Sequence, residues 1–188
     1  WFDFYLKGVG DQPGLWIEIQ SNQGDWRLEE RYPPSNTTEL AFDLGGTLAN
    51  VGGGTTVLPD ANNGPVWETE PISEPIYMAG TPRLHVDVTT ATVGGQLFAL
   101  LEDCDENDYC IHIGHAIMDL RYHEGGDEIQ TWTPVLETIN AKMEFMPLDA
   151  EVPAGHTLRL SLLSTGEDYL PASTSSVVFI QEGESSTL

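Results

Sequence analysis

One stretch decides the fold: Gly155-His156-Thr157-Leu158-Arg159-Leu160-Ser161-Leu162-Leu163-Ser164. Leu158, Leu160 and Leu162 alternate with Arg159, Ser161 and Leu163, so that one side of the stretch is apolar throughout. A period of two with one apolar side predicts a half-buried β-strand. Such a strand needs further strands beside it and an apolar layer above it.

The rest of the chain offers strands of the same kind. Strand-like patterns occur at 15–20, 25–30 and 37–44, resume from Val66, and continue at 76–78, 83–89, 96–101, 110–122, 138–146 and 176–180. The 19 glycines and 12 prolines supply the turns between them. About ten short strands, with turn signals roughly every 8–15 residues, predict an all-β fold, a jelly-roll β-sandwich of the galactose-binding-like kind. Residues 45–65 are rich in glycine and show little alternation, which indicates a long loop.

The first eight residues have a different character. Trp1, Phe4 and Tyr5 follow the i, i+3, i+4 spacing of a helix, and Gly8 stands where a helix commonly stops. We interpret residues 1–8 as the end of a helix that belongs to a preceding domain. Residues 9–188 then form the sandwich domain.

Charge is the strongest signal in the composition. The chain has 30 acidic and 7 basic residues, for a net charge of −23. Such a charge excludes nucleic acid as a partner, because phosphates would be repelled. Acidic residues are spread along the chain, which fits adaptation to high salt or an acidic secreted protein. An extracellular or high-salt cytoplasmic location is favoured, and no apolar run approaches the roughly 20 residues that cross a bilayer.

Cys104 and Cys110 are the only cysteines, and five residues that resemble a polar turn separate them. Two strand ends that face each other across a short loop can meet the geometry of a disulfide. A bridge there would suit an extracellular protein. Two unpaired thiols are the alternative.

The sequence contains no catalytic apparatus of its own. It has no Gly-x-Ser-x-Gly elbow of the kind that carries a serine nucleophile. Asp103, Asp105 and Asn107 resemble the start of a calcium loop, but the later loop positions do not match, so a solvated turn is favoured over calcium. His112 and His115 differ by three residues, which on a regular strand places them on opposite faces and argues against a zinc pair. We therefore expect no cofactor, with calcium as the weaker alternative.

Tryptophan offers one further possibility for function. Exposed aromatic residues on an acidic sandwich could form a platform for carbohydrate, whereas at strand spacing such residues more often belong to the core. The tryptophans concerned are Trp16, Trp26, Trp67 and Trp132.

Several stretches, in their order and spacing, resemble one family. They are Trp1–Gly8, Trp26-Arg27, Tyr32-Pro33-Pro34, Gly52-Gly53-Gly54, the segment from Pro71 to Val86, Gly114–Tyr122 and Gly155–Ser164. In these stretches the chain is similar to the C-terminal domain of the X-prolyl dipeptidyl-peptidase family of α/β-hydrolases, which includes cocaine esterase. The high acidity and the Cys104–Cys110 loop depart from the family pattern. Residues 183–188 stop just short of the family's last motif, which implies that a final strand is missing.

The resemblance implies a jelly roll that supports a serine hydrolase. The family's Ser, Asp and His all lie in an upstream α/β-hydrolase domain, so no catalytic residue is expected in this chain and the fragment alone should be inactive. In relatives the domain packs on the hydrolase domain, helps to roof the substrate pocket and often contributes to oligomer contacts. Val57 and Leu58, in the glycine-rich loop, are the candidates for the pocket roof, and His156 is expected to be a structural hydrogen-bonder. The competing hypothesis is a free-standing module that binds carbohydrate or a cell surface.

Overall fold

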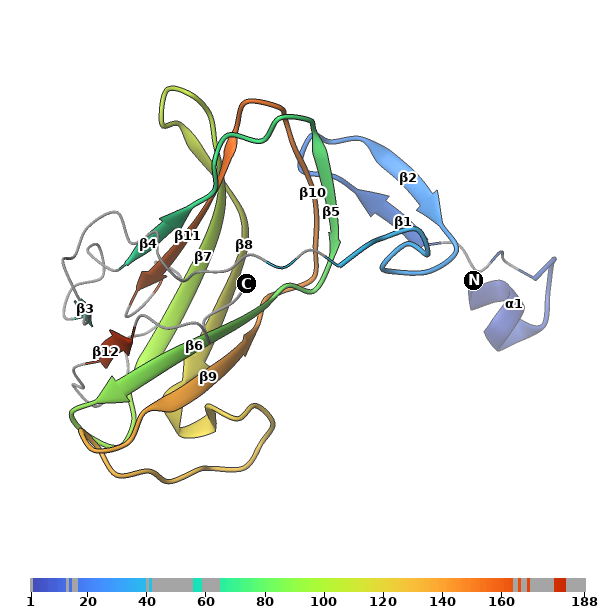
Figure 1. The fold of residues 1–188 in the computed structure, drawn as a ribbon. Coiled ribbons are helices and arrows are strands. Elements are labelled where there is room, and N and C mark those ends of the chain that lie inside the picture. Colours follow the sequence, from blue (N-terminus) through green and yellow to red (C-terminus); the bar gives the residue numbers. More distant parts are fainter. Residues whose placement is uncertain are drawn as a thin grey trace.

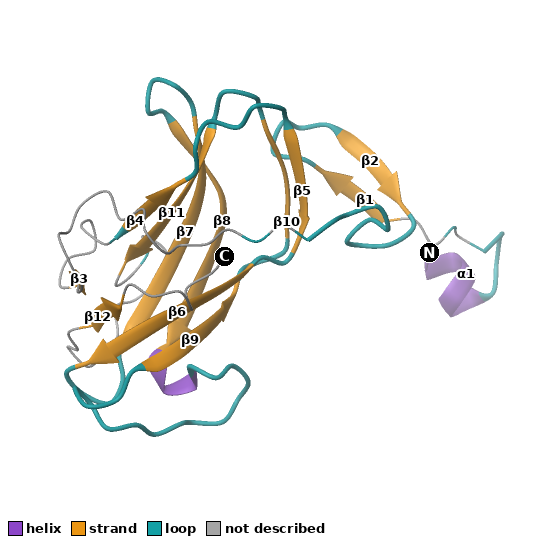
Figure 2. Ribbon diagram, viewed as in Figure 1, coloured by secondary structure: helices purple, strands orange, loops and turns teal. Residues whose placement is uncertain are grey.

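The computed structural model describes residues 2–12, 14, 17–39, 41, 56–58, 65–163, 166, 169 and 178–181, and these form an all-β fold with one short helix (Figures 1 and 2). The elements in chain order are α1 (Phe2–Lys7), β1 (Ile17–Gln20), β2 (Trp26–Glu29), β3 (Thr56–Leu58), β4 (Val66–Glu68), β5 (Ile76–Gly80), β6 (Arg83–Thr90), β7 (Gln96–Cys104), β8 (Cys110–Asp119), the 3₁₀ turn η1 (Leu120–Tyr122), β9 (Ile139–Glu144), β10 (Leu148–Val152), β11 (Thr157–Leu163) and β12 (Val178–Gln181).

Two four-stranded antiparallel sheets make the body of the molecule. Their strand orders are β4-β11-β7-β8 and β3-β12-β6-β9, and Figure 1 shows the two sheets facing each other. Apolar residues from both inner faces fill the space between them, among them Leu84, Val86, Leu97, Leu101 and Met143. The all-β sandwich predicted from the alternating pattern is confirmed, with the two four-stranded sheets of a jelly roll.

The stretch that decided the fold is an inner strand of the first sheet. β11 pairs with β4 on one side and with β7 on the other. Leu158, Leu160 and Leu162 are all buried, whereas Arg159 and Leu163 on the opposite face are half-exposed. The apolar side of the strand therefore lies against the second sheet, as its alternation predicts.

A bent ribbon connects the sandwich to a smaller sheet. β6 pairs with β9 and, beyond a bend, β5 pairs with β10, so that both strands of the ribbon bend together. Gly80 lies at the bend with a φ of +147°, a value that side chains with a Cβ rarely adopt. β10 was not predicted, although Leu148–Val152 alternates apolar and acidic residues with a period of two, because the segment is only five residues long and lies between Pro147 and Pro153.

At the N-terminus, α1 and the β1–β2 hairpin lie apart from the sandwich, on the side of β5 and β10 (Figure 2). The predicted helix is confirmed over Phe2–Lys7, and Gly8 follows it with the left-handed φ of +67° that favours glycine after a helix. Within the described residues, no helix is long and apolar enough to span a bilayer.

Two expectations for the region between β2 and β4 need correction. The strand predicted over 37–44 is wrong in its described part, since residues 37–39 are not in a strand. Pro33 and Pro34 precede this part of the chain, and proline cannot donate a ladder hydrogen bond. The long loop predicted over 45–65 contains the short strand β3, which pairs with β12.

Candidate functional site

Among the strands of the described chain, the most exposed large apolar side chains lie on the outer face of the β1–β2 hairpin. The register pairs Gln20 with Trp26 and Glu18 with Leu28, so these four side chains share one face. Trp26 is 66% exposed and Leu28 is 59% exposed. Trp26 and Leu28 are two positions apart on β2, so their exposed apolar side chains are neighbours on this face. We refer to Glu18, Gln20, Trp26 and Leu28 as the outer hairpin face.

A polar clamp holds the opposite face of the hairpin on the β5–β10 sheet. The Arg27 guanidinium donates to both carboxylate oxygens of Asp149, one of them at 2.6 Å, and also to Glu29 Oε1 at 2.7 Å. Tyr77 Oη donates to the same Asp149 carboxylate, and the Arg27 guanidinium carbon lies 4.5 Å from the centre of the Tyr77 ring. A two-pronged guanidinium–carboxylate pair fixes direction as well as distance. The clamp therefore sets how the outer hairpin face is presented.

The clamp also changes the acidity of its members. The hydrogen bond to Asp149 raises the pKa of Arg27 further above its usual value. Burial, followed by the hydrogen bond to Asp149, raises the pKa of Tyr77 to about 12. Arg27 is therefore a permanent cation in this clamp, and Tyr77 keeps its proton beyond the pH at which an ordinary tyrosine loses it.

Two further side chains attach the hairpin region to the same small sheet. The Asn22 side chain donates to the Glu151 carbonyl at 3.1 Å and accepts from the Glu151 N–H at 2.8 Å, and so pairs with the edge of β10. Tyr32 Oη accepts from the Gly80 N–H at 2.8 Å and donates to the Leu148 carbonyl. Polar contacts from Asn22, Arg27 and Tyr32 thus hold the region at three points.

Helix α1 precedes the hairpin in the sequence and also exposes apolar side chains. Phe2 and Leu6 are exposed, and none of the described residues of the helix is buried. Lys7 and Asp3, one turn apart in the helix, form an ion pair at 2.6 Å, and both side chains are exposed. The described part of α1 therefore presents apolar side chains on its surface, next in sequence to the hairpin.

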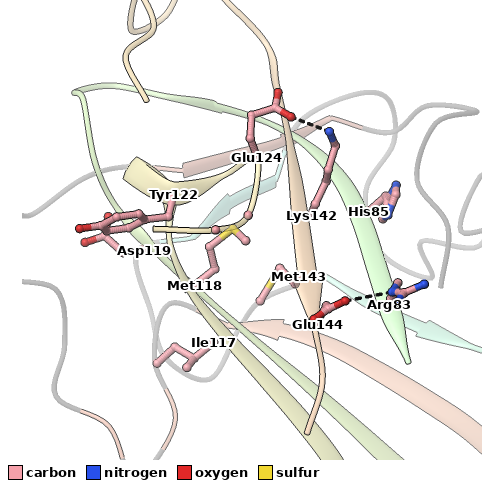
Figure 3. Close-up of a pocket in the computed structure, with 12 residues that line it drawn as sticks. Arg83, His85, Ile117, Met118, Asp119, Tyr122, Glu124, Lys142, Met143 and Glu144 are labelled. Carbon is pink, nitrogen blue, oxygen red and sulfur yellow. Dashed lines mark hydrogen bonds and ion pairs between the residues drawn. The ribbon is translucent and has the colours of Figure 1, made fainter. Parts of the chain in front are cut away.

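A groove of about 640 Å³ lies between β6, β9 and the end of β8 (Figure 3). Its sides carry two ion pairs, Arg83–Glu144 at 3.0 Å and Lys142–Glu124 at 2.5 Å, as Figure 3 shows. The described residues that line it include no serine, cysteine or threonine. The described lining of the groove therefore offers no hydroxyl or thiol nucleophile of the serine-hydrolase or cysteine-hydrolase kind.

The acidic loop at the β7–β8 turn is closed by a disulfide. The structure joins Cys104 and Cys110, which are also partners in the strand register. Asp105 Oδ1 accepts from the backbone N–H groups of Asn107 and Tyr109, and these bonds lower the pKa of Asp105. The loop is thus organised by backbone hydrogen bonds to one carboxylate.

The residues proposed as a weak calcium set point to different partners. Asp103 is buried and its Oδ1 lies 2.7 Å from His156 Nδ1, while Asp105 faces its own turn. Among the described residues, no three His, Cys, Asp or Glu side chains gather as metal ligands would. His156 makes the kind of hydrogen bond that the family resemblance implied for it.

The expectation that His112 and His115 lie on opposite faces of a strand is wrong. His115 Nδ1 lies 3.2 Å from His112 Nε2. The ladder pairs Leu101 with Gly114 but Glu102 with His112, so that Ile113 is an extra residue in a β-bulge. The bulge shifts the alternation by one and brings both histidines to the outer face of the sheet. The signal in the sequence is Gly114, next to the extra residue, because a glycine inside a strand pattern often marks a bulge.

The candidate pocket residues Val57 and Leu58 belong to β3, where their backbones pair with Phe179 and Val178 of β12. Their side chains lie outside the described residues. This places the two positions in a strand at the edge of the second sheet.

The tryptophans do not form a platform in the described part of the chain. Trp67 and Trp132 are buried in the core, and Trp26 is exposed on the hairpin. Trp16 lies outside the described residues.

Comparison with protein families identifies one match along the chain. Residues 7–185 match the family described as the X-Pro dipeptidyl-peptidase C-terminal non-catalytic domain. No curated protein sequence matches the chain.

Solved structures of similar fold include larger enzymes. A CocE/NonD family hydrolase from Staphylococcus aureus superposes with a TM-score of 0.73 at 16% identity, over 99% of this chain and 43% of the hydrolase. An aminopeptidase from a marine sediment Thaumarchaeota archaeon gives a TM-score of 0.70 at 15% identity, over 99% of this chain and 41% of that enzyme. An α-amino acid ester hydrolase gives 0.56 at 17% identity, over 65% of this chain and 24% of the hydrolase. This chain spans less than half the length of each.

Proposed function

The chain belongs to the family of X-Pro dipeptidyl-peptidase C-terminal non-catalytic domains, and from this premise we propose that it is the accessory jelly roll of a larger serine hydrolase. More than half of each similar solved enzyme lies outside the match. The proposed partner is an α/β-hydrolase domain of the same polypeptide, in which a serine attacks an acyl carbonyl with a histidine as base and an aspartate that orients it. The proposed activity is of the X-Pro dipeptidyl-peptidase type, and the proposed substrate class comprises peptides, esters and amides.

The observation that carries the proposal is the outer hairpin face. Trp26 and Leu28 are largely exposed, while the clamp on the other side of the hairpin fixes their direction. An apolar surface held rigidly by polar contacts is suited to a partner that buries it, because little ordering is needed on binding. We propose that the hydrolase domain covers this face together with α1.

A finer part of the proposal concerns the substrate pocket. Val57 and Leu58 lie in the edge strand β3, and in the family this part of the chain lies near the acyl pocket. We propose that they contribute to the roof of that pocket. The expected result for Val57→Ala or Leu58→Ala in the whole enzyme is a changed KM with the thermal stability preserved. An unchanged KM for both variants would remove these residues from the pocket.

The first experiment labels the whole polypeptide with a fluorophosphonate, which reacts with activated serines. We expect one labelled serine, outside the 188 residues of this chain. A label within this chain, or none at all in a polypeptide that hydrolyses X-Pro substrates, would contradict the proposal.

A second experiment tests the docking surface in the same whole polypeptide by hydroxyl-radical footprinting. Trp26 should be protected, while Tyr109, which is 71% exposed on the sandwich, should be oxidised readily. Leu28→Ser should then restore oxidation at Trp26, whereas the matched control Leu136→Ser, at another exposed leucine, should not. Rapid oxidation of Trp26 in the unmodified protein would favour a free-standing module instead.

A further inference from the structure

We propose that His112 and His115 form a two-histidine binding site for a first-row transition-metal dication of the Ni²⁺, Cu²⁺ and Zn²⁺ group. Imidazole nitrogen is a ligand that these three metals share. The two rings approach through His115 Nδ1 and His112 Nε2, which are 3.2 Å apart. The described chain supplies two ligands here, and water would complete the coordination.

The distance between the two nitrogens fits a shared metal. Bonds of about 2.0–2.1 Å at a tetrahedral angle place two ligand nitrogens about 3.4 Å apart. The observed 3.2 Å is close to this edge length, and it is also at the long end of the range for a nitrogen hydrogen bond. A metal could therefore enter between the rings with a small rotation of the exposed His112 side chain.

A hydrogen bond on the far side of His115 favours the ligand form of its ring. His115 Nε2 lies 2.8 Å from Tyr169 Oη. When Nε2 carries the proton and donates it to Tyr169, Nδ1 is left with a lone pair that points at His112. Histidines that bind metals usually donate their second ring N–H in this way, which fixes the tautomer.

Aromatic packing holds the same ring in place. Phe98 of β7 stacks on His115 with ring centres 5.6 Å apart and an angle of 23° between the planes, and it also contacts Tyr169. Gly166 lets the Tyr169 segment approach, because a Cβ at that position would lie 2.6 Å from the Phe98 ring. His115 is thus oriented from two sides, whereas His112 is exposed and free to adjust.

A carboxylate beside the histidines and the acidity of the whole chain favour a cation, although the register partner of Glu102 on its other side is Arg159 of β11. Glu102 is the register partner of His112 on β7, so its carboxylate lies on the same outer face as both histidines. The whole chain carries a net charge of −23, which raises the local concentration of dications. The β-bulge at Ile113 is the feature that creates the site, since without it the two rings would lie on opposite faces.

The test is a calorimetric titration of the whole polypeptide with ZnCl₂, NiCl₂ and CuCl₂, in high salt with excess Mg²⁺ to occupy carboxylates. We expect saturable binding of one metal ion that is lost in both His112→Gln and His115→Gln. The matched control His85→Gln, which removes a histidine from β6, should bind as the unmodified protein does. His112 is exposed, so His112→Gln should fold normally and keeps the test decisive even if His115→Gln does not fold.

Tyr169→Phe tests the positioning role of the hydroxyl. Loss of such a second-layer hydrogen bond typically weakens metal binding by about 10–100-fold. Electron paramagnetic resonance of the Cu²⁺ complex should show coupling to two imidazole nitrogens. Binding that survives His112→Gln, coupling to fewer than two nitrogens, or no saturable binding in the presence of Mg²⁺ would each overturn the site.

Discussion

The sandwich and the N-terminal hairpin are built on opposite principles. In the sandwich, two sheets press their apolar faces together, and Leu84, Leu97 and Leu162 are fully buried. In the hairpin, Trp26 and Leu28 face away from the rest of the described chain, and polar contacts such as Arg27–Asp149 hold the strands in place. The sandwich is stabilised by the burial of a large apolar surface, an effect that does not depend on direction. The hairpin is held by a few charged hydrogen bonds, whose geometry is specific.

The difference shows which part of the molecule is complete by itself. The sandwich buries its apolar residues within the chain. The hairpin is attached through polar contacts and leaves its apolar face exposed, and an exposed apolar face is typical of a binding surface. The contrast can be tested by changing each kind of contact separately and asking where the loss of stability occurs.

The largest effect is expected in the sandwich core. Leu162→Ala should lower the free energy of unfolding by about 2–5 kcal/mol, because it removes buried methyl groups and leaves a cavity between the sheets. In the 188-residue chain without the hydrolase domain, Leu28→Ala on the outer hairpin face should change it by less than about 0.5 kcal/mol. Denaturant unfolding of the two variants measures both values. Equal losses would show that the hairpin face is packed as tightly as the core.

The disulfide of the β7–β8 loop comes next. The unmodified protein should gain two hydrogens in mass on reduction, and Cys104→Ser should lower stability by about 2 kcal/mol, a value at the low end for disulfides because the closed loop is short. Mass spectrometry with and without reductant, followed by thermal melts, measures both effects. An unchanged mass on reduction would mean free thiols in solution.

A smaller and local effect is expected from the clamp. Asp149→Asn should lower the free energy of opening of the β1–β2 hairpin by about 1.5 kcal/mol, because hydrogen bonds between charged partners are replaced by weaker ones. Hydrogen exchange should speed up in β1 and β2, with little change in β6 and β7. Faster exchange throughout the sandwich would contradict the separation of the two regions.

Alkaline pH should loosen the same clamp. The pKa of Tyr77 is raised from 10.0 to about 12, so the folded protein holds this proton where the unfolded chain has lost it. The contribution of Tyr77 to stability is therefore complete below pH 10 and is lost as the pH rises from about 10 to 12. The difference between the tyrosinate absorbance curves of the unmodified protein and Tyr77→Phe should show one group that titrates late. A difference curve centred at pH 10 would contradict this assignment.

Salt should affect the two regions in opposite directions, with the smallest change at the hairpin. Screening reduces the self-repulsion that accompanies a net charge of −23, so we expect the melting temperature to rise with salt. The Arg27–Asp149 pair should be weakened slightly by the same screening. Thermal melts and hydrogen exchange at several salt concentrations measure both trends. No rise in melting temperature would remove high-salt adaptation as the reason for the acidity.

The sequence by itself determined the fold class and much of the element order. Leu158, Leu160 and Leu162 alternate with other residues. Successive side chains of a β-strand point to opposite faces, so a strand is the structure that buries all three on one side. The terminal helix and its stop at Gly8 could also be predicted from local spacing. The family followed from several short motifs in a fixed order.

Only the tertiary structure decided which side chains meet. The bulge at Ile113 reverses the face of His115 relative to His112, and a one-residue shift of this kind depends on how two strands pair. Arg27 and Asp149 are 122 positions apart, so the clamp and the direction of the outer hairpin face depend on contacts that no local pattern encodes. Periodicity is a property of neighbours along the chain, whereas sites are made by neighbours in space.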